Sequence, residues 1–217
     1  MTARTVLAID LSTTRGDLAV ARGGELLFEG HFTAQRSHNA ELFAPLAAAL
    51  DAAGGGLDLI VVGTGPGSYT GARIAIAAAQ GVGLSRAIPI VGWPSICAPR
   101  EGMASFRVIG DARRGLFYTA HVEEGALKGD LQLHDAETAR GRVNAADSGP
   151  WLTFDATVPL GLSKVLPAHP SASRLAMLTQ SLSGDEISRR ATQPLEPVYL
   201  QDPFITTSKR RGKMPAL

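Results

Sequence analysis

The feature that most constrains the fold of this 217-residue chain is a pattern that occurs twice. In the first copy an apolar, strand-like run ends at Asp10, and a turn and a second strand-like run follow it. In the second copy the same order of elements is built around Asp111. A repeated supersecondary unit says more about architecture than any single motif. We therefore predict an α/β protein of two related lobes.

The elements around the two copies predict how the lobes are divided. After the first copy come a helix, a buried-type strand at residues 59–63 that should run parallel to the first strand, and a second helix that ends near Arg86. These elements complete a lobe over residues 1–100. The second copy opens a smaller lobe over residues 101–217, with an extended segment at 194–200 that returns to the body. This order is typical of the two-lobed actin-like, or duplicated ribonuclease-H-like, fold with mixed sheets and a reduced second lobe.

The charge, cysteine and histidine content excludes several classes of function. A net charge of +1 produces no strong positive electrostatic field, which argues against general nucleic-acid binding by the isolated chain. The single cysteine, Cys97, cannot form an internal disulfide, and no two of the five histidines have the helical spacing of a metal-binding pair. A strand pattern begins at Thr5 without a basic leader segment, so we expect a cytoplasmic protein. The spacing of the histidines leads us to expect no metal site. The basic cluster at 209–213 is interpreted as a solvated tail, with contact to RNA or to an acidic partner as the alternative.

A glycine-rich loop at residues 65–71 follows a strand and opens a helix, as a phosphate-binding loop does. A Walker loop needs Lys and Ser or Thr after its last glycine, whereas this chain has an alanine and Arg73. It is not a nucleophile elbow either, because Tyr69 stands at its centre. We interpret the loop as a tight turn capped by Ser68 or Thr70, whose N–H groups could meet an anion.

Two groups of polar residues are candidates for a nucleotide cleft. Actin-like ATPases hold a metal shell with an Asp after the first strand and hold phosphates with the hairpins of both lobes. Asp10 with Ser12 and Thr13 meets half of that requirement, and Asp111 with Arg113 resembles the other half. Alternatively, each Asp only caps its own hairpin turn. The second lobe lacks a glycine-rich phosphate loop, so we do not expect tight ATP binding by the chain alone. A free-standing actin-like small-molecule kinase or ATPase remains the alternative function.

The second helix, residues 70–86, is apolar or small on nearly every side. Such a helix must be buried on two sides, one of which can face the sheet. The small residues Ala75, Ala79 and Gly83, spaced by four, would allow a second helix to approach closely. We therefore expect a subunit interface to cover the other side, the alternative being burial under the first helix of the same chain.

Five blocks occur in order along almost the whole chain, at residues 7–13, 65–74, 79–81, 111–118 and 196–200. Together they resemble the bacterial TsaB (YeaZ) family of tRNA threonylcarbamoyladenosine biosynthesis proteins, which are paralogues of TsaD within the actin-like ATPase superfamily. The block with the sequence GPGSYTGAR is the most specific of the five.

The resemblance implies a non-catalytic subunit rather than an enzyme. Such a subunit binds and activates the TsaD transferase, which carries a threonylcarbamoyl group to N6 of adenosine 37 (t6A37) in tRNAs that read ANN codons. It implies a heterodimer with TsaD that the ATPase TsaE joins, a homodimer when the protein is alone, and contact with tRNA only through the complex. The nucleotide cleft would be degenerate, with ATP or ADP bound only at the TsaD complex.

The resemblance also implies where partner and nucleotide bind. The partner surface would lie on the two helices of the first lobe, at His38, Leu42, Phe43, Leu46, Tyr69, Arg73, Ile76, Ala79, Gln80 and Gly83. Vestigial or shared nucleotide contacts would come from Asp10, Ser12, Thr13, Asp111 and Arg113. A metallopeptidase activity, a third possibility for this superfamily, would have no metal ligands here.

Overall fold

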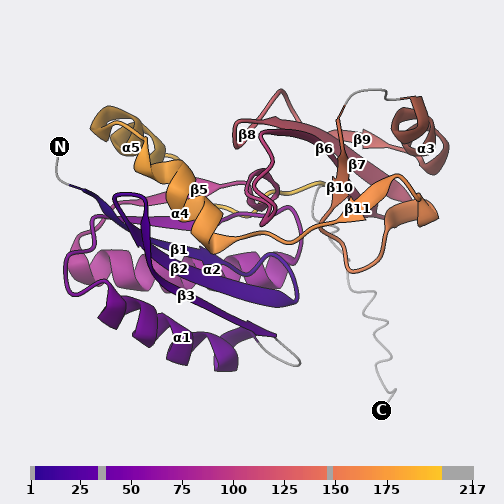
Figure 1. Ribbon diagram of the computed structural model, residues 1–217. Helices are drawn as coiled ribbons and strands as arrows, with labels where there is room; N and C mark the ends of the chain where they lie inside the picture. Colours follow the sequence, from indigo (N-terminus) through magenta and orange to yellow (C-terminus); the bar gives the residue numbers. More distant parts are fainter. Residues whose placement is uncertain (1–2, 34–37, 146–148, 202–217) are drawn as a thin grey trace, which may run out of the picture.

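The computed structural model describes residues 3–33, 38–145 and 149–201, and it describes the side chains of all of these except 38–40. The basic cluster at 209–213 therefore lies outside the described residues. Figure 1 shows two sheets, one in each half of the chain, with the helices arranged around them. In this part of the chain no helix is both long enough and apolar enough to cross a bilayer.

The first sheet contains five strands in the order β3-β2-β1-β4-β5. They are β1 (Thr5–Asp10), β2 (Arg15–Arg22), β3 (Glu25–Thr33), β4 (Leu59–Gly63) and β5 (Ile90–Trp93). The first three strands form an antiparallel meander. The predicted parallel pairing of β4 with β1 is confirmed, and β5 continues it. Because α-helices connect the parallel strands and cover both faces, β1 and β4 are completely buried, in keeping with their apolar sequences.

The second sheet repeats this plan with shorter strands. They are β6 (Ser105–Arg113), β7 (Leu116–Glu123), β8 (Ala126–Leu127), β9 (Gln132–His134), β10 (Trp151–Thr153) and β11 (Val165–Pro167). As in the first sheet, the opening hairpin is antiparallel and the later strands, here β10 and β11, run parallel to its first strand. The duplicated, actin-like architecture with a reduced second lobe is thereby confirmed.

Helices cover both faces of the first sheet. Figure 1 shows α1 (His38–Ala52) and α2 (Tyr69–Arg86) side by side on one face, and α4 (Ala172–Gln180) on the other. α5 (Gly184–Ala191) packs beside β5, and α3 (Ala136–Ala145) packs on the second sheet. Two short 3-10 helices, Ser95–Cys97 and Pro159–Gly161, complete the described elements. The sequence patterns did not predict α3 or α5.

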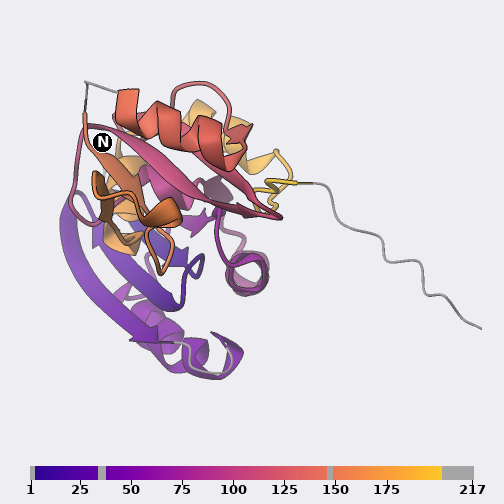
Figure 2. The ribbon, with the colours of Figure 1, turned by 90° about the vertical axis from the view of Figure 1, so that its right-hand side faces the viewer.

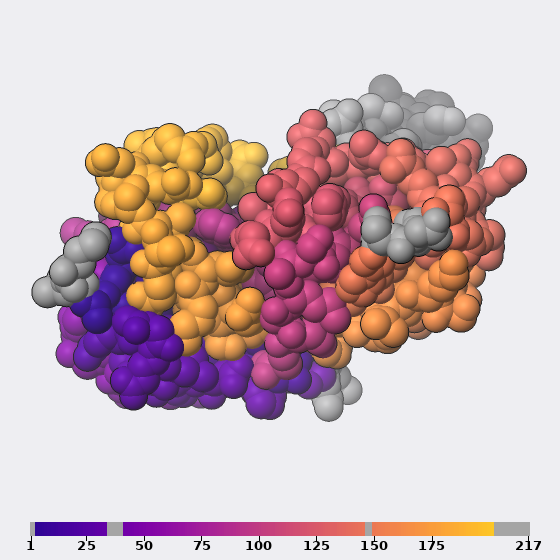
Figure 3. All heavy atoms as spheres, turned by 45° about the horizontal axis from the view of Figure 1, so that its top comes forward, coloured from indigo at the N-terminus to yellow at the C-terminus, as the bar shows by residue number. Residues whose placement is uncertain are grey.

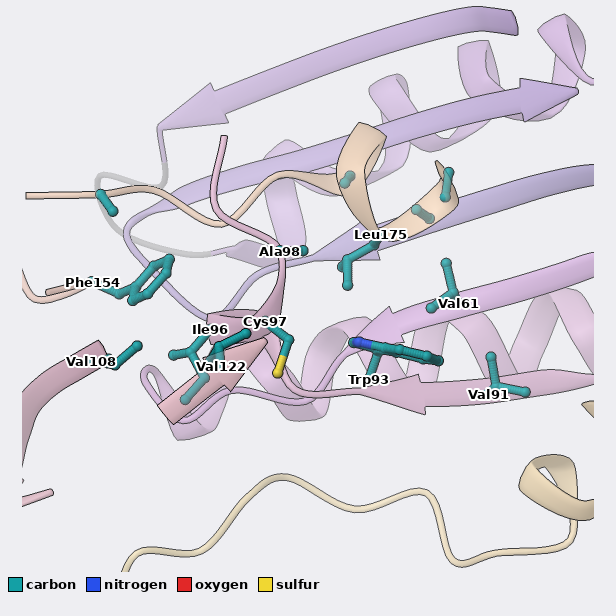
Figure 4. Close-up of a cluster of buried hydrophobic side chains, with 14 of the residues drawn as sticks. Val61, Val91, Trp93, Ile96, Cys97, Ala98, Val108, Val122, Phe154 and Leu175 are labelled. Carbon is teal, nitrogen blue, oxygen red and sulfur yellow. The ribbon is translucent and has the colours of Figure 1, made fainter. Parts of the chain in front are cut away.

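A single buried cluster joins the two lobes. In Figure 4, Val91 and Trp93 of the first sheet, Val108 and Val122 of the second, and Leu175 of α4 surround the same core. Cys97 is buried within this cluster as a small apolar side chain. Its burial raises the pKa of the thiol to about 12, so the thiol stays protonated and unreactive at neutral pH.

Two of the segments in which the described chain passes between the lobes are hydrogen-bonded to each other. Arg100 N donates to His169 O at 3.0 Å, and Ser171 N donates to Ala98 O at 2.9 Å. After the later of these segments, α4 lies across β1 and β2, where Figure 3 shows its orange atoms against the indigo strands. The return to the first lobe therefore begins at α4, well before residues 194–200. The division at residue 100 stays a prediction about folding units.

Candidate functional site

The glycine-rich loop is held in place by hydrogen bonds within the chain. Ser68 caps α2, as predicted, since its hydroxyl accepts from Gly71 N at 3.1 Å. Ser68 N donates to the Ser12 carbonyl, and Gly65 N donates to the Ser95 hydroxyl at 2.9 Å. These three N–H groups of the loop are therefore satisfied within the chain, and the anion contact stays a prediction.

The glycines of this loop allow two backbone segments to touch. A Cβ atom on Gly71 would overlap the carbonyl oxygen of Leu11, and one on Gly67 would overlap that of Ser12. Only glycine permits this approach, because a backbone carbonyl cannot move aside as a side chain can. The loop therefore fastens the N-terminus of α2 to the turn that follows β1.

Asp10 is buried at the end of β1, with only 1% of its surface exposed. Its Oδ1 accepts hydrogen bonds from Ser12 N at 2.8 Å and from Ser12 Oγ at 2.6 Å. Burial raises the pKa of Asp10, and the hydrogen bonds from Ser12 oppose that rise. Thr13 is half-buried, and its hydroxyl donates to Arg15 O at 3.0 Å. Asp10 thus caps its own turn through Oδ1, whereas its Oδ2 is buried without a hydrogen-bond partner among the described residues. The nucleotide contacts of Asp10, Ser12 and Thr13 stay a prediction.

We expect Asp10→Asn to change the pH dependence of stability. A raised carboxyl pKa in the folded protein means that stability is highest below the unfolded pKa of 3.8 and is lost as pH rises through the folded pKa. Asparagine keeps an acceptor for Ser12 and cannot ionise. The free energy of unfolding of the variant, relative to wild type, should therefore increase from pH 4 to pH 8. Urea unfolding across this pH range measures it, and a constant difference would contradict the assignment.

The second lobe carries a pair of carboxylates, of which only Asp111 was predicted from the sequence. Asp111 N donates to Asp155 Oδ2 at 2.6 Å, and Asp111 Oδ1 accepts from Arg113 N at 2.7 Å. Burial raises the pKa of Asp155, and the neighbouring Asp111 carboxylate adds to this rise. Asp155 follows the short strand β10, so the same strand–Asp pattern that marked Asp10 could have revealed it. Across the described residues, no group of three or more His, Cys, Asp or Glu side chains is placed to hold a metal ion.

The C-terminal segment connects both lobes near these turns. Val198 N donates to Thr64 O at 2.8 Å, and Gln201 Nε2 donates to Ala112 O at 2.7 Å. Tyr199 lies between these residues and shares a 3.2 Å hydrogen bond between its hydroxyl and that of Tyr69. Both tyrosines are about half exposed, at 50% and 48%. They form an aromatic pair at the start of α2.

Half of the predicted partner-surface residues are buried within the chain itself. These are Leu42 and Leu46 of α1 and Ile76, Ala79 and Gly83 of α2, all of which pack toward the first sheet. Phe43, Tyr69, Arg73 and Gln80 are exposed. His38 begins α1, and its side chain is among those not described.

The small residues of α2 do not face a second helix, which corrects the sequence-based expectation. Ala75, Ala79 and Gly83 lie against the sheet, and a Cβ atom on Gly83 would come within 2.7 Å of the Ile90 side chain. The small side chains thus bring the helix close to its own sheet. The outward side of α2 carries another set of residues, namely Arg73, Ala77, Gln80, Gly81 and Leu84.

The outward sides of α2 and of its neighbour α1 expose apolar side chains to solvent. Leu84 is 88% exposed, and Phe43 on the neighbouring helix α1 is 67% exposed. The exposed positions next to Phe43 in α1 include Ala44, Ala47 and Ala48. We call the outward sides of α1 and α2 the helix face. Apolar side chains that gather on one face of a folded domain are typical of a protein–protein contact.

Comparisons with known proteins point to tRNA threonylcarbamoyladenosine biosynthesis. A family model described as TsaD, tRNA N6-adenosine threonylcarbamoyltransferase, matches residues 32–139. The tRNA threonylcarbamoyladenosine biosynthesis protein TsaB of Escherichia coli is 30% identical over 163 residues, which cover 68% of this chain and 69% of that protein. An uncharacterized protein of Mycobacterium tuberculosis is 32% identical over 209 residues, 92% of each chain. The solved structure of YeaZ from Pseudomonas aeruginosa superposes with a TM-score of 0.64 at 23% identity, covering 91% of this chain and 100% of that one.

Proposed function

The chain belongs to the TsaB family of tRNA threonylcarbamoyladenosine biosynthesis proteins, and on this basis we propose that it is a non-catalytic subunit that binds and activates the TsaD transferase. In this role it supports the transfer of a threonylcarbamoyl group to N6 of adenosine 37 in tRNAs that read ANN codons. TsaE joins the pair as the ATPase of the complex, and tRNA is contacted through the complex. The chain forms a homodimer when TsaD is absent.

The observation that carries this proposal is the helix face. Leu84 and Phe43 are large apolar side chains that lie mostly in solvent on neighbouring helices. Their burial against a partner would remove this apolar surface from water, at about 25 cal/mol per Å². Arg73, which lies 5.5 Å from the centroid of the Tyr69 ring, adds an aromatic and a cationic contact at one end of the helix face. Tyrosine and arginine are both enriched at the centres of interfaces.

The state of Asp10 supports a non-catalytic role over the alternative of a free-standing kinase. A carboxylate that organises the metal shell of ATP must reach solvent and ligand, whereas Asp10 is buried and its Oδ1 is occupied by Ser12. Any ATP or ADP would therefore bind at the TsaD complex rather than tightly to this chain. Calorimetry of the isolated chain with Mg-ATP separates the two functions, since sub-micromolar binding with turnover would favour the kinase.

The proposal is tested by co-elution with the TsaD of the same organism. We expect size-exclusion chromatography with light scattering, at micromolar concentration, to give a one-to-one heterodimer and to convert the homodimer of the free chain into it. We also expect threonylcarbamoyl transfer to adenosine 37 by TsaD and TsaE to require this chain. Separate elution of the two proteins, or full transfer without the chain, would overturn the proposal.

A further inference from the structure

A cavity of about 380 Å³ lies on the outer side of the second sheet, away from the first lobe. We call it the outer pocket and define it by Trp151, Arg107, His121, Lys128, Asp130 and Arg142. Figure 2 shows α3 lying over this sheet, and Arg142 and Ala145 bring the C-terminal end of that helix to the pocket. The outer pocket is separate from the helix face, which belongs to α1 and α2.

Strand register explains why the outer pocket is polar. Arg107 on β6 stands opposite His121 on β7 and beside Trp151 on β10, so these three residues form one row across three neighbouring strands. The adjacent residues Val108 and Leu152 point to the opposite side of the sheet, into the core between the lobes. The row must therefore face outward.

The charges around the row favour an anion. Among the described residues that line the pocket are three cationic side chains, those of Arg107, Lys128 and Arg142, and one carboxylate, that of Asp130. Lys128 also forms an ion pair with Glu123 at 3.0 Å, which offsets part of its charge and leaves the two arginines as the main cationic groups. Arginine and lysine donors around a recess are the groups that bind phosphate oxygens most strongly.

Trp151 provides an independent indication of a ligand. It is 5% exposed, and its indole N–H has no hydrogen-bond acceptor among the described residues. The Arg107 guanidinium lies 6.0 Å from the centroid of the indole ring. Buried indole N–H groups usually have a partner. An acceptor oxygen of a bound molecule beside Arg107 would supply one.

We propose that the outer pocket binds a small phosphate monoester of about the size of a mononucleotide. Its volume lies within the range of ligand pockets, roughly 300–1,000 Å³. The phosphate would lie among Arg107, Lys128 and Arg142. The net charge of only +1 favours a small anion over a long polyanion, which needs an extended basic surface.

The two tryptophans allow a direct test on the isolated protein. The indole N–H of Trp93 donates to Gly125 O at 2.9 Å in the core and serves as an internal reference. In ¹⁵N-labelled protein we expect the indole signal of Trp151 to shift and saturate during titration with AMP or ribose 5-phosphate, while that of Trp93 stays in place. Inorganic phosphate should bind more weakly at the same site, and adenosine should not bind. A Trp93→Phe variant assigns the two signals.

Variants on two elements test the residues of the outer pocket. Arg107→Gln and Arg142→Gln should each weaken AMP binding about 10-fold or more, because each removes a charged donor to phosphate. The matched control is Arg140→Gln, which lies on α3 with Arg142 but outside the pocket, and should leave affinity unchanged. An unshifted Trp93 signal verifies that each variant is folded.

Three results would overturn this proposal. They are an unmoved Trp151 signal at 10 mM AMP and phosphate, equal responses to chloride and phosphate, and binding confined to RNA oligonucleotides. None of them bears on the association with TsaD, which concerns the other lobe.

Discussion

Replacing Leu84 by lysine should weaken the association with TsaD about 100-fold, a loss of about 2.7 kcal/mol that is typical of a residue at the centre of an interface. Leu84 is 88% exposed near the end of α2, so the chain itself gains little from its apolar side chain. Lysine is a good helix former and is favourable near a helix C-terminus. The variant should therefore fold normally and fail only in binding, as measured by calorimetry with TsaD.

Two further variants decide whether the helix face is responsible. Phe43→Lys, on α1, should weaken binding to a similar extent. Leu166→Lys is the matched control, because Leu166 is an exposed leucine, at 49%, on β11 of the second lobe. If Leu166→Lys reduces the affinity as much as Leu84→Lys does, the partner surface lies elsewhere.

Gly71→Ala should destabilise the free chain by about 2–4 kcal/mol, the range of overpacking in a site that cannot relax. The added Cβ would overlap the carbonyl oxygen of Leu11, which is backbone in the turn after a buried strand. Either α2 moves away from the sheet or the turn after β1 is distorted. Equilibrium unfolding in urea measures the loss.

Gly81→Ala, in the same helix, is the matched control and should have the opposite sign. A Cβ atom on Gly81 meets no atom within 4 Å. Alanine there should increase stability by about 0.5–1 kcal/mol, because glycine is the less favourable residue inside a helix. Equal effects of the two substitutions would show that the contact between Gly71 and Leu11 is not what requires glycine.

The elements that the sequence predicted are those whose residues are buried in regular order. β1, β4 and the paired hairpins were recognisable because their apolar runs end at turn residues and recur in both halves. By contrast, α3 buries only Ala139 and Val143, and α5 buries only Ile187, so neither has a pronounced apolar stripe. The strands β8, β9 and β11 have two or three residues each, too few for a period to be visible.

The sequence predicted which helices form the functional surface, but not which side of each helix is exposed. An almost wholly apolar helix indicates that both of its sides are covered. It does not reveal which of its residues pack against the sheet. The close approach of α2 to β5 assigns Ala79 and Gly83 to the interior and leaves Leu84 outside. The outer pocket was likewise hidden, because Arg107, His121 and Trp151 come together only through pairing of three strands.

The position of α4 has a consequence for synthesis on the ribosome. The face of the first sheet that α4 covers is translated before residue 65, whereas α4 ends at Gln180. Synthesis proceeds at about 5–20 residues per second, so this apolar face stays uncovered for several seconds, until α4 has been synthesised after most of the second lobe. During that interval the uncovered apolar surface makes the nascent chain prone to aggregation.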